Sequence, residues 1–245
     1  MTKKHATYLA ATLAALTMTA SAVPQPLINV DLTTTLAKGS FEFENRILWS
    51  HSSGADELSF SHEIEFGVTE NFEIDLYLSE WSWSKVDGEG SDSIWESAGI
   101  EGLYSFSNPS TDALGVALAV ETQFGNDFWV LEPQLRFQKN VGPVILMANL
   151  VFANEFLKDE ADGQEFAQSI GASYQVTPNF FVGADISHAT VFTDWKDSEN
   201  EWYAGPAVHF RSGSVWATLG ASFKLSADAD DAADVVIGTK FGINF

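Results

Sequence analysis

Apolar residues recur at nearly every second position from Ser40 to the last residue, and this period of two constrains the fold more than any other feature. The clearest run places Leu114, Val116, Leu118 and Val120 on one parity. Successive side chains of a β-strand point to opposite faces, so the pattern predicts strands with one apolar face each. We expect an all-β protein with twelve strands, at residues 40–50, 57–68, 72–84, 93–107, 112–125, 128–140, 142–157, 164–177, 179–193, 201–212, 214–226 and 233–245.

The predicted connections alternate in length. Four are tight turns, at residues 69–71, 140–142, 177–179 and 212–214, and the connection 108–111 on the same side is a little longer. The others are mostly longer and acidic, at residues 51–56, 84–92, 125–127, 157–165, 194–200 and 226–234. Short turns on one side and long loops on the other are typical of transmembrane β-barrels, whose short turns are periplasmic. The sequence therefore predicts a single antiparallel transmembrane β-barrel over residues 40–245.

The aromatic residues separate by predicted height along the strands. Most tryptophans fall near the long loops: Trp49, Trp81, Trp83, Trp95, Trp129, Trp195 and Trp202. Trp216 falls at the short-turn end, together with Phe72, Phe106, Phe137, Phe180, Phe210 and Phe245. Two aromatic belts around an apolar band are expected of a barrel in an outer membrane, whereas a secreted β-sandwich does not need them.

The first 22 residues have the features of an export signal. Lys3 and Lys4 precede a mostly apolar run over residues 6–20, and Ala20-Ser21-Ala22 supplies small residues for cleavage. The apolar run is shorter than the roughly 20 residues of a membrane-spanning helix. Residues 1–22 are thus predicted to be a signal peptide. Residues 23–39 would form a short N-terminal periplasmic segment, whose alternation could instead make it an extra strand or a plug.

Two local patterns resemble known outer-membrane proteins. The chain ends on a strand in which Phe241, Ile243 and Phe245 share one face. This ending resembles the C-terminal signal of bacterial outer-membrane barrels, which implies recognition by the barrel-assembly machinery. Residues 63–74, EIEFGVTENFEI, resemble a hairpin of the family labelled "MetA-pathway of phenol degradation" and related outer-membrane transporters, and Gly205-Pro206 also fits. The resemblance implies an outer-membrane barrel and names no substrate.

Composition excludes several functions. The chain has 34 Asp and Glu against 12 Lys and Arg, so its formal net charge is −22. An acidic chain without a basic stripe repels phosphate, and we expect no nucleic-acid partner. The absence of cysteine excludes disulfides, thiol catalysis and cysteine-bound metals. The 19 Phe, 8 Trp and 5 Tyr supply too much burial for a disordered chain.

Charged residues gather on the strand parity that would face the barrel interior. Six carboxylates lie on the first three strands: Glu42, Glu44, Glu63, Glu65, Glu73 and Asp75. Further candidates for the lining are Arg46, Glu101, Glu121, Arg136, Arg211 and Lys240. One interpretation is a pore whose acidic wall favours cations or polar neutral solutes. The other is an ion-pair network, neutralised by Arg211, Lys224 and Lys240, that fills a narrow barrel.

Two polar residues conflict with this parity. Asn45 and His62 fall on the lipid-facing positions near the middle of their strands, where an unsatisfied polar group is costly. We expect a β-bulge that switches the parity nearby.

Catalytic and metal-binding motifs are weak. The outer-membrane phospholipase resembles this architecture in strand number and has a His and a Ser two residues apart on one strand. Here only His51 and Ser53 show that spacing, and they fall in a predicted loop. The acidic stretches 159–163 and 228–231 lack a complete calcium-loop motif. We predict no enzyme activity and no cofactor.

The sequence thus predicts an outer-membrane channel for passive passage of small solutes through an acidic-lined barrel. The alternative is a structural or surface-interaction barrel without transport, and a membrane-embedded hydrolase is the least favoured. The expected partners are outer-membrane lipid and lipopolysaccharide, the barrel-assembly machinery, and small solutes. Divalent ions could bridge the acidic loops to lipopolysaccharide.

Overall fold

The computed structural model describes residues 25–245 except 89, 159–162, 195–196 and 230–231. The predicted signal peptide and Trp195 lie outside these residues. Within the described part of the chain, no helix has the length and apolar composition needed to cross a membrane.

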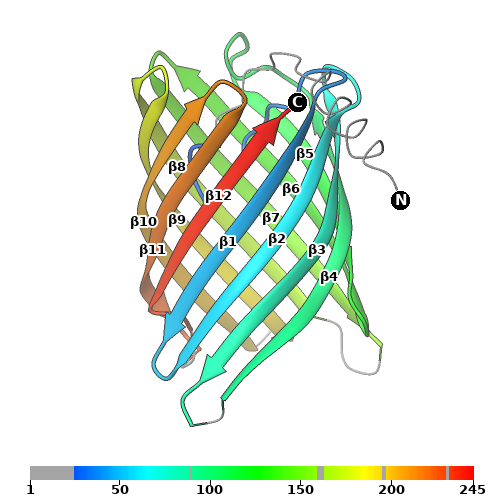
Figure 1. Ribbon diagram of the computed structural model, residues 1–245, viewed down its shortest axis with the longest axis vertical. Helices are drawn as coiled ribbons and strands as arrows, with labels where there is room; N and C mark the ends of the chain where they lie inside the picture. The colour runs from blue at the N-terminus through cyan, green and yellow to red at the C-terminus, as the bar shows by residue number, and fades with distance from the viewer. Residues whose placement is uncertain (1–24, 89, 159–162, 195–196, 230–231) are drawn as a thin grey trace, which may run out of the picture.

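Twelve antiparallel strands close into one barrel (Figure 1). Closure pairs β1 with β12, from Glu42 opposite Asn244 to His51 opposite Val235. The predicted all-β fold and the number of strands are confirmed. The strands are β1 (Phe41–Ser52), β2 (Ala55–Gly67), β3 (Phe72–Val86), β4 (Gly90–Ser105), β5 (Gly115–Phe124), β6 (Phe128–Val141), β7 (Val144–Leu157), β8 (Gly163–Thr177), β9 (Phe180–Asp194), β10 (Asp197–Ser212), β11 (Val215–Ala227) and β12 (Val235–Asn244).

The alternation in the sequence separates an apolar outer face from a polar interior. On β5, the inward-facing Ala117, Ala119 and Glu121 are buried. Val120 faces outward and is exposed. Large apolar side chains stay exposed on the other strands too, including Ile170 at 63% and Leu219 at 51%. A closed sheet leaves no unpaired edge, and an apolar exterior of this extent is stable in lipid.

We call the end of the barrel at which β1 begins and β12 ends the terminal end. Phe41 and Phe245 stack there with ring centroids 5.1 Å apart. The connections at this end span residues 68–71, 106–114, 142–143, 178–179 and 213–214.

The predicted contrast between short turns and long loops is wrong. At the opposite end the strands extend into several of the predicted loops, and the first connection is only residues 53–54, where Gly54 has a φ of 95°. The longest connection, 106–114, lies instead at the terminal end. Acidic residues in strands that extend beyond the bilayer remain in water, so their polarity does not mark a loop.

The bulge that the sequence predicts lies in β3 rather than beside Asn45. His62 pairs with Ser79 and Glu63 pairs with Tyr77, which leaves Leu78 as the extra residue. Asn45 and His62 therefore keep their outward parity. They satisfy each other, because His62 Nδ1 lies 2.6 Å from Asn45 Oδ1, and the indole nitrogen of Trp81 lies 3.4 Å from His62 Nε2.

Candidate functional site in the barrel interior

Six interior carboxylates form a continuous ladder across half of the barrel. Each one is the register partner of the next on the neighbouring strand, and together they cross β1 to β6. The carboxylate ladder consists of Glu42, Glu65, Asp75, Glu101, Glu121 and Glu132.

The carboxylate ladder climbs away from the terminal end. Glu42 is one residue from the start of β1, whereas Glu132 is nine residues from the end of β6 that lies at the terminal end. Neighbouring strands are about 4.8 Å apart and tilted by about 40°, so five steps climb roughly 15 Å along the barrel axis. The ladder is thus a ramp along the inner wall and not a flat ring.

A cavity of about 520 Å³ follows the ladder. Glu44, Glu63 and Glu73, which the sequence places in the lining, also face it. The cavity walls include twelve acidic side chains: Asp31, Glu44, Glu63, Glu65, Glu73, Asp75, Glu80, Glu96, Glu101, Glu121, Glu132 and Glu201. Against these stand three Lys or Arg side chains, Arg46, Arg136 and Lys240, and one histidine, His188.

One buried ion pair interrupts the acidic wall. Arg136 Nη2 donates to both carboxylate oxygens of Glu101 at 2.9 Å, and its Nε donates to Gln134 Oε1 at 3.1 Å. Both charged side chains are less than a tenth exposed. Removal of one partner from such a pair would leave the other charge buried and alone, which is strongly destabilising.

The other predicted bases have partners outside the ladder. Lys240 binds Asp31 of the N-terminal segment at 2.9 Å, and Lys224 binds Asp234 at 2.7 Å. Arg211 lies at the terminal end of β10, where its Nε donates to the Pro178 carbonyl. Of the three ion pairs described here, only the link between Arg136 and Glu101 includes a ladder carboxylate, and Arg136 is not one of the three bases that the sequence assigns to the ion-pair network.

Glu42 is held by two neutral donors from the other side of the barrel closure. Trp216 Nε1 donates to Glu42 Oε1 at 2.6 Å, and the Asn244 amide donates to Glu42 Oε2. Trp216 is fully buried. The prediction that Trp216 belongs to an aromatic belt is therefore wrong, since its indole nitrogen is used inside the barrel.

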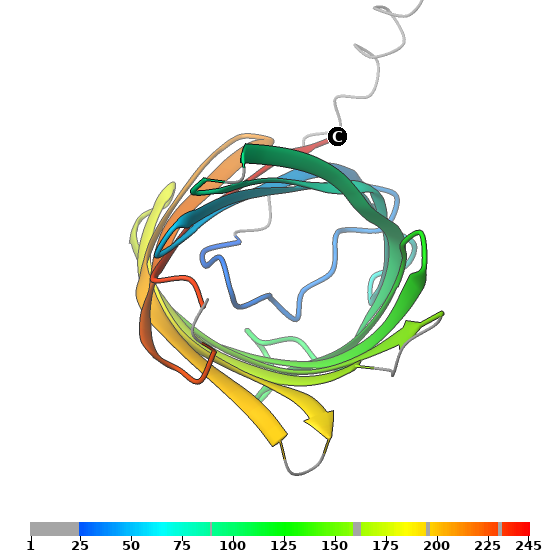
Figure 2. The same cartoon turned by 90° about the horizontal axis from the view of Figure 1, so that it is seen from below.

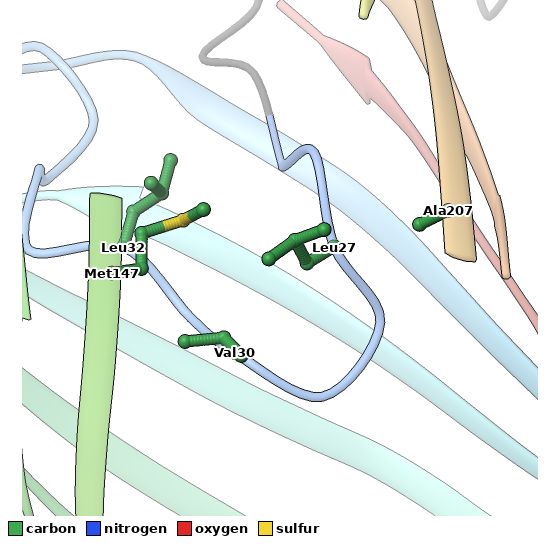
Figure 3. Packing of buried hydrophobic residues seen from close by; sticks show 5 residues of the cluster. All are labelled: Leu27, Val30, Leu32, Met147 and Ala207. Atoms are coloured by element: carbon green, nitrogen blue, oxygen red, sulfur yellow. The ribbon is translucent and has the colours of Figure 1, made fainter. Parts of the chain in front are cut away.

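Residues 25–39 lie inside the barrel rather than beside it (Figure 2). They form no strand. Leu27, Val30 and Leu32 pack with Met147 and Ala207 of the inner wall into one buried cluster (Figure 3).

Glycines on the inner wall make room for this segment. An added Cβ would lie 2.2 Å from Leu27 Cδ1 at Gly171 and 2.8 Å from Leu27 Cδ2 at Gly183. Ile28 is accommodated in the same way by Gly220 and Gly238, each with 2.7 Å to an Ile28 carbon. The side chains of Leu27 and Ile28 thus lie directly against the glycine backbone of the wall, in space that a Cβ would fill.

Polar contacts fix the segment at intervals. Asn29 Nδ2 donates to Asp185 Oδ1 at 2.8 Å and to Ser222 Oγ at 2.9 Å. Thr33 N donates to Gln138 Oε1 at 3.0 Å, and Leu36 N donates to Glu73 Oε2. The segment thus touches the wall on both halves of the barrel.

Asp31 is the one acidic residue of the segment among the described residues. Burial alone would raise its pKa, but the ammonium of Lys240 and the guanidinium of Arg136 hold that pKa well below its usual range. Asp31 is therefore ionised at neutral pH, and it stabilises the docked segment above the pKa of an unfolded aspartate, about 3.9.

Sequence reasoning missed some interior acids. Glu80 and Glu96 face the cavity and accept hydrogen bonds from Ser97 and Ser82, each at 2.5 Å. The bulge at Leu78 shifts the parity of β3, so strict alternation misplaces Glu80. The sequence contains one sign of this shift, because the apolar residues Leu78 and Trp81 lie on opposite parities of the same strand.

The other predicted positions have unremarkable surroundings. Phe241 and Ile243 face outward on β12, as a terminal strand in lipid requires, and recognition by the assembly machinery remains a prediction. His51 Nδ1 lies 2.9 Å from Asp56 Oδ1 at the far hairpin, with Ser53 in the turn. The acidic stretches 159–163 and 228–231 lie partly outside the described residues.

A closed antiparallel barrel with an apolar exterior and a polar interior defines an outer-membrane β-barrel protein, as the sequence predicted. Residues 128–235 match the model of a family of unknown function (DUF6662). No curated protein matches the sequence.

Solved structures of outer-membrane barrels share the fold. The COG4313 outer membrane channel from Pseudomonas putida F1 superposes with a TM-score of 0.72 at 10% identity, covering 89% of this chain and 100% of that one. The NanC porin gives 0.56 at 9% identity, with 82% and 98% covered. The KdgM porin gives 0.53 at 11% identity, with 84% and 99% covered. At these identities the likeness is one of fold.

Proposed function

We propose that this barrel is an outer-membrane channel for small cationic or polar solutes, and that residues 25–39 close it at rest. The carboxylate ladder carries the proposal, because five of its six residues line the cavity and, among the ion pairs of the described residues, only Glu101 of the ladder has a basic partner. Rings of like charge set the selectivity of channels by attracting the opposite ion. The solved channel and porins that share this fold support a transport role of this general kind.

The N-terminal segment supports closure in particular. It occupies the interior without joining the sheet, so it can leave without breaking a strand pair. Its apolar seat and its scattered polar contacts are those of a docked peptide. A channel with such a segment conducts when the segment is displaced.

Planar bilayers test the proposal directly. The mature chain and a variant lacking residues 25–36 are reconstituted in a KCl gradient, after heat-modifiable migration has shown that both are folded. We expect rare, small openings from the mature chain and steady conductance with cation preference from the truncated variant. A sealed bilayer with both would refute the channel and favour a structural barrel.

A further inference from the structure

Five acidic side chains converge at the terminal end of the acidic wall. Their carboxylate oxygens form two groups, Glu42 with Glu44 and Glu65, and Glu65 with Glu73 and Asp75. Within each group the oxygens all lie within 4.8 Å of one another. Two ligand bonds of about 2.4 Å to one calcium ion span the same distance.

The second group has the free ligand capacity. In the first group, both oxygens of Glu42 already accept hydrogen bonds from Trp216 and Asn244. In the second, Asp75 is 5% exposed, and its Oδ1 is buried without a hydrogen-bond partner. A buried carboxylate oxygen with no donor is costly unless a cation or a proton satisfies it.

None of the ion pairs among the described residues includes Glu65, Glu73 or Asp75. Arg136, whose charge also acts on Glu73 and Asp75, forms its ion pair with Glu101 instead. Three clustered carboxylates in a poorly hydrated wall attract a hard cation, because oxygen ligands suit Ca²⁺ and Mg²⁺.

We propose that Glu65, Glu73 and Asp75 bind one divalent cation of the calcium type at the terminal end of the barrel interior. The ion would link β2 to β3 beside the point where Leu36 N meets Glu73. It would thereby brace the wall on which the last part of the N-terminal segment rests. The proposal stands apart from transport, because binding requires no open path.

Calorimetry on the folded, lipopolysaccharide-free protein in detergent tests the site. Ca²⁺ is titrated after chelator treatment in a large excess of K⁺, which screens diffuse attraction by surface acids. We expect saturable binding of one ion per barrel and an affinity at least tenfold lower in Glu65→Gln. The matched control is Glu121→Gln, a buried ladder residue outside both groups, which should retain the affinity of the unmodified protein.

Two outcomes of the calcium titration would contradict the site. No saturable binding, or the same loss in Glu65→Gln and Glu121→Gln, would overturn the site. Should Glu65→Gln fail to fold, Asp75→Asn replaces it, and the unfolding temperature of the unmodified protein must rise with Ca²⁺ relative to chelator. A barrel that binds Ca²⁺ yet never conducts would refute only the transport proposal, whereas conductance without binding would refute only this one.

Discussion

The two halves of the inner wall differ in kind. The half formed by β1 to β6, the acidic wall, carries the carboxylate ladder and the ion pair of Arg136 with Glu101. The half formed by β7 to β12, the neutral wall, presents mostly small or uncharged side chains. Buried examples on the neutral wall are Asn149, Ser169, Ser173, Ala207, Thr218 and Ser222.

The two walls have different roles: the neutral wall holds the N-terminal segment, and the acidic wall lines the cavity. The apolar residues of the N-terminal segment rest on the neutral wall, where glycines and small residues leave space for Leu27 and Ile28. Asn149, with its amide oriented to satisfy both groups, donates to the Asp31 carbonyl at 3.1 Å and accepts from Asp31 N at 2.9 Å. The acidic wall holds the segment only at a few points and leaves most of its carboxylates facing the cavity.

The largest expected effect comes from the ion pair of the acidic wall. Arg136→Met leaves Glu101 buried between two other ladder carboxylates without its partner. We expect the free energy of unfolding to fall by about 3–5 kcal/mol. Urea unfolding in lipid vesicles measures it, with Lys139→Met on the same strand as the control, since Lys139 makes only an exposed contact to the Asp112 carbonyl. Equal losses in the two variants would show that the pair does not hold the wall.

The neutral wall is tested through the docked segment. Leu27→Asp places a charge where Leu27 is now fully buried. Loss of the burial of a leucine costs at least about 2 kcal/mol, which is roughly a thirtyfold shift toward the undocked segment. Because the chain has no cysteine, a Val30→Cys reporter should be protected from maleimide in the otherwise unmodified chain and labelled in the Leu27→Asp background.

The control for this labelling is Lys38→Cys, since Lys38 is exposed and should react in either background. Rapid labelling of Val30→Cys without the Leu27 change would contradict the docked position of the segment.

The hydrogen bond between Trp216 and Glu42 joins the two walls. Trp216→Phe keeps an aromatic ring and removes the indole donor, so one buried carboxylate oxygen loses its partner. We expect a loss of about 1–3 kcal/mol in unfolding free energy. The variant Trp129→Phe, which changes an exposed outer tryptophan, serves as the comparison. A larger loss of unfolding free energy in Trp129→Phe than in Trp216→Phe would contradict the importance of the hydrogen bond to Glu42.

The smallest effect is expected outside both walls. Lys158 and Asp127 form an exposed pair at 3.4 Å. Lys158→Ala should change the unfolding free energy by no more than about 0.5 kcal/mol, because exposed ion pairs are screened by water and salt. A loss comparable to that of Arg136→Met would mean that burial is not what distinguishes the acidic wall.

The strands could be predicted closely from the alternation because burial in lipid leaves one parity apolar. The parity also located Glu42, Glu65, Asp75 and Glu101 on the inner face. The alternation does not specify the register between strands, which is fixed by hairpins and by the bulge at Leu78. The alignment of these acids into one ladder therefore could not be predicted from the sequence.

The N-terminal segment shows the other limit of the sequence. Its alternation suits a strand as well as a docked peptide, and the choice depends on glycines more than 130 residues away, such as Gly171 and Gly183. Trp216 illustrates the same limit, because its position near a strand end suggested a belt while its hydrogen-bond partner lies on β1.

Selection of the solute by the acidic wall is tested most directly by the reversal potential of the open barrel. In the variant lacking residues 25–36, the six ladder residues are changed to Gln or Asn and compared with Asn149→Ala, Ser169→Ala and Thr218→Ala on the neutral wall. We expect the cation preference across a KCl gradient to fall toward unity in the ladder variant and to persist in the neutral-wall variant. An unchanged preference in the ladder variant would contradict selection by the acidic wall.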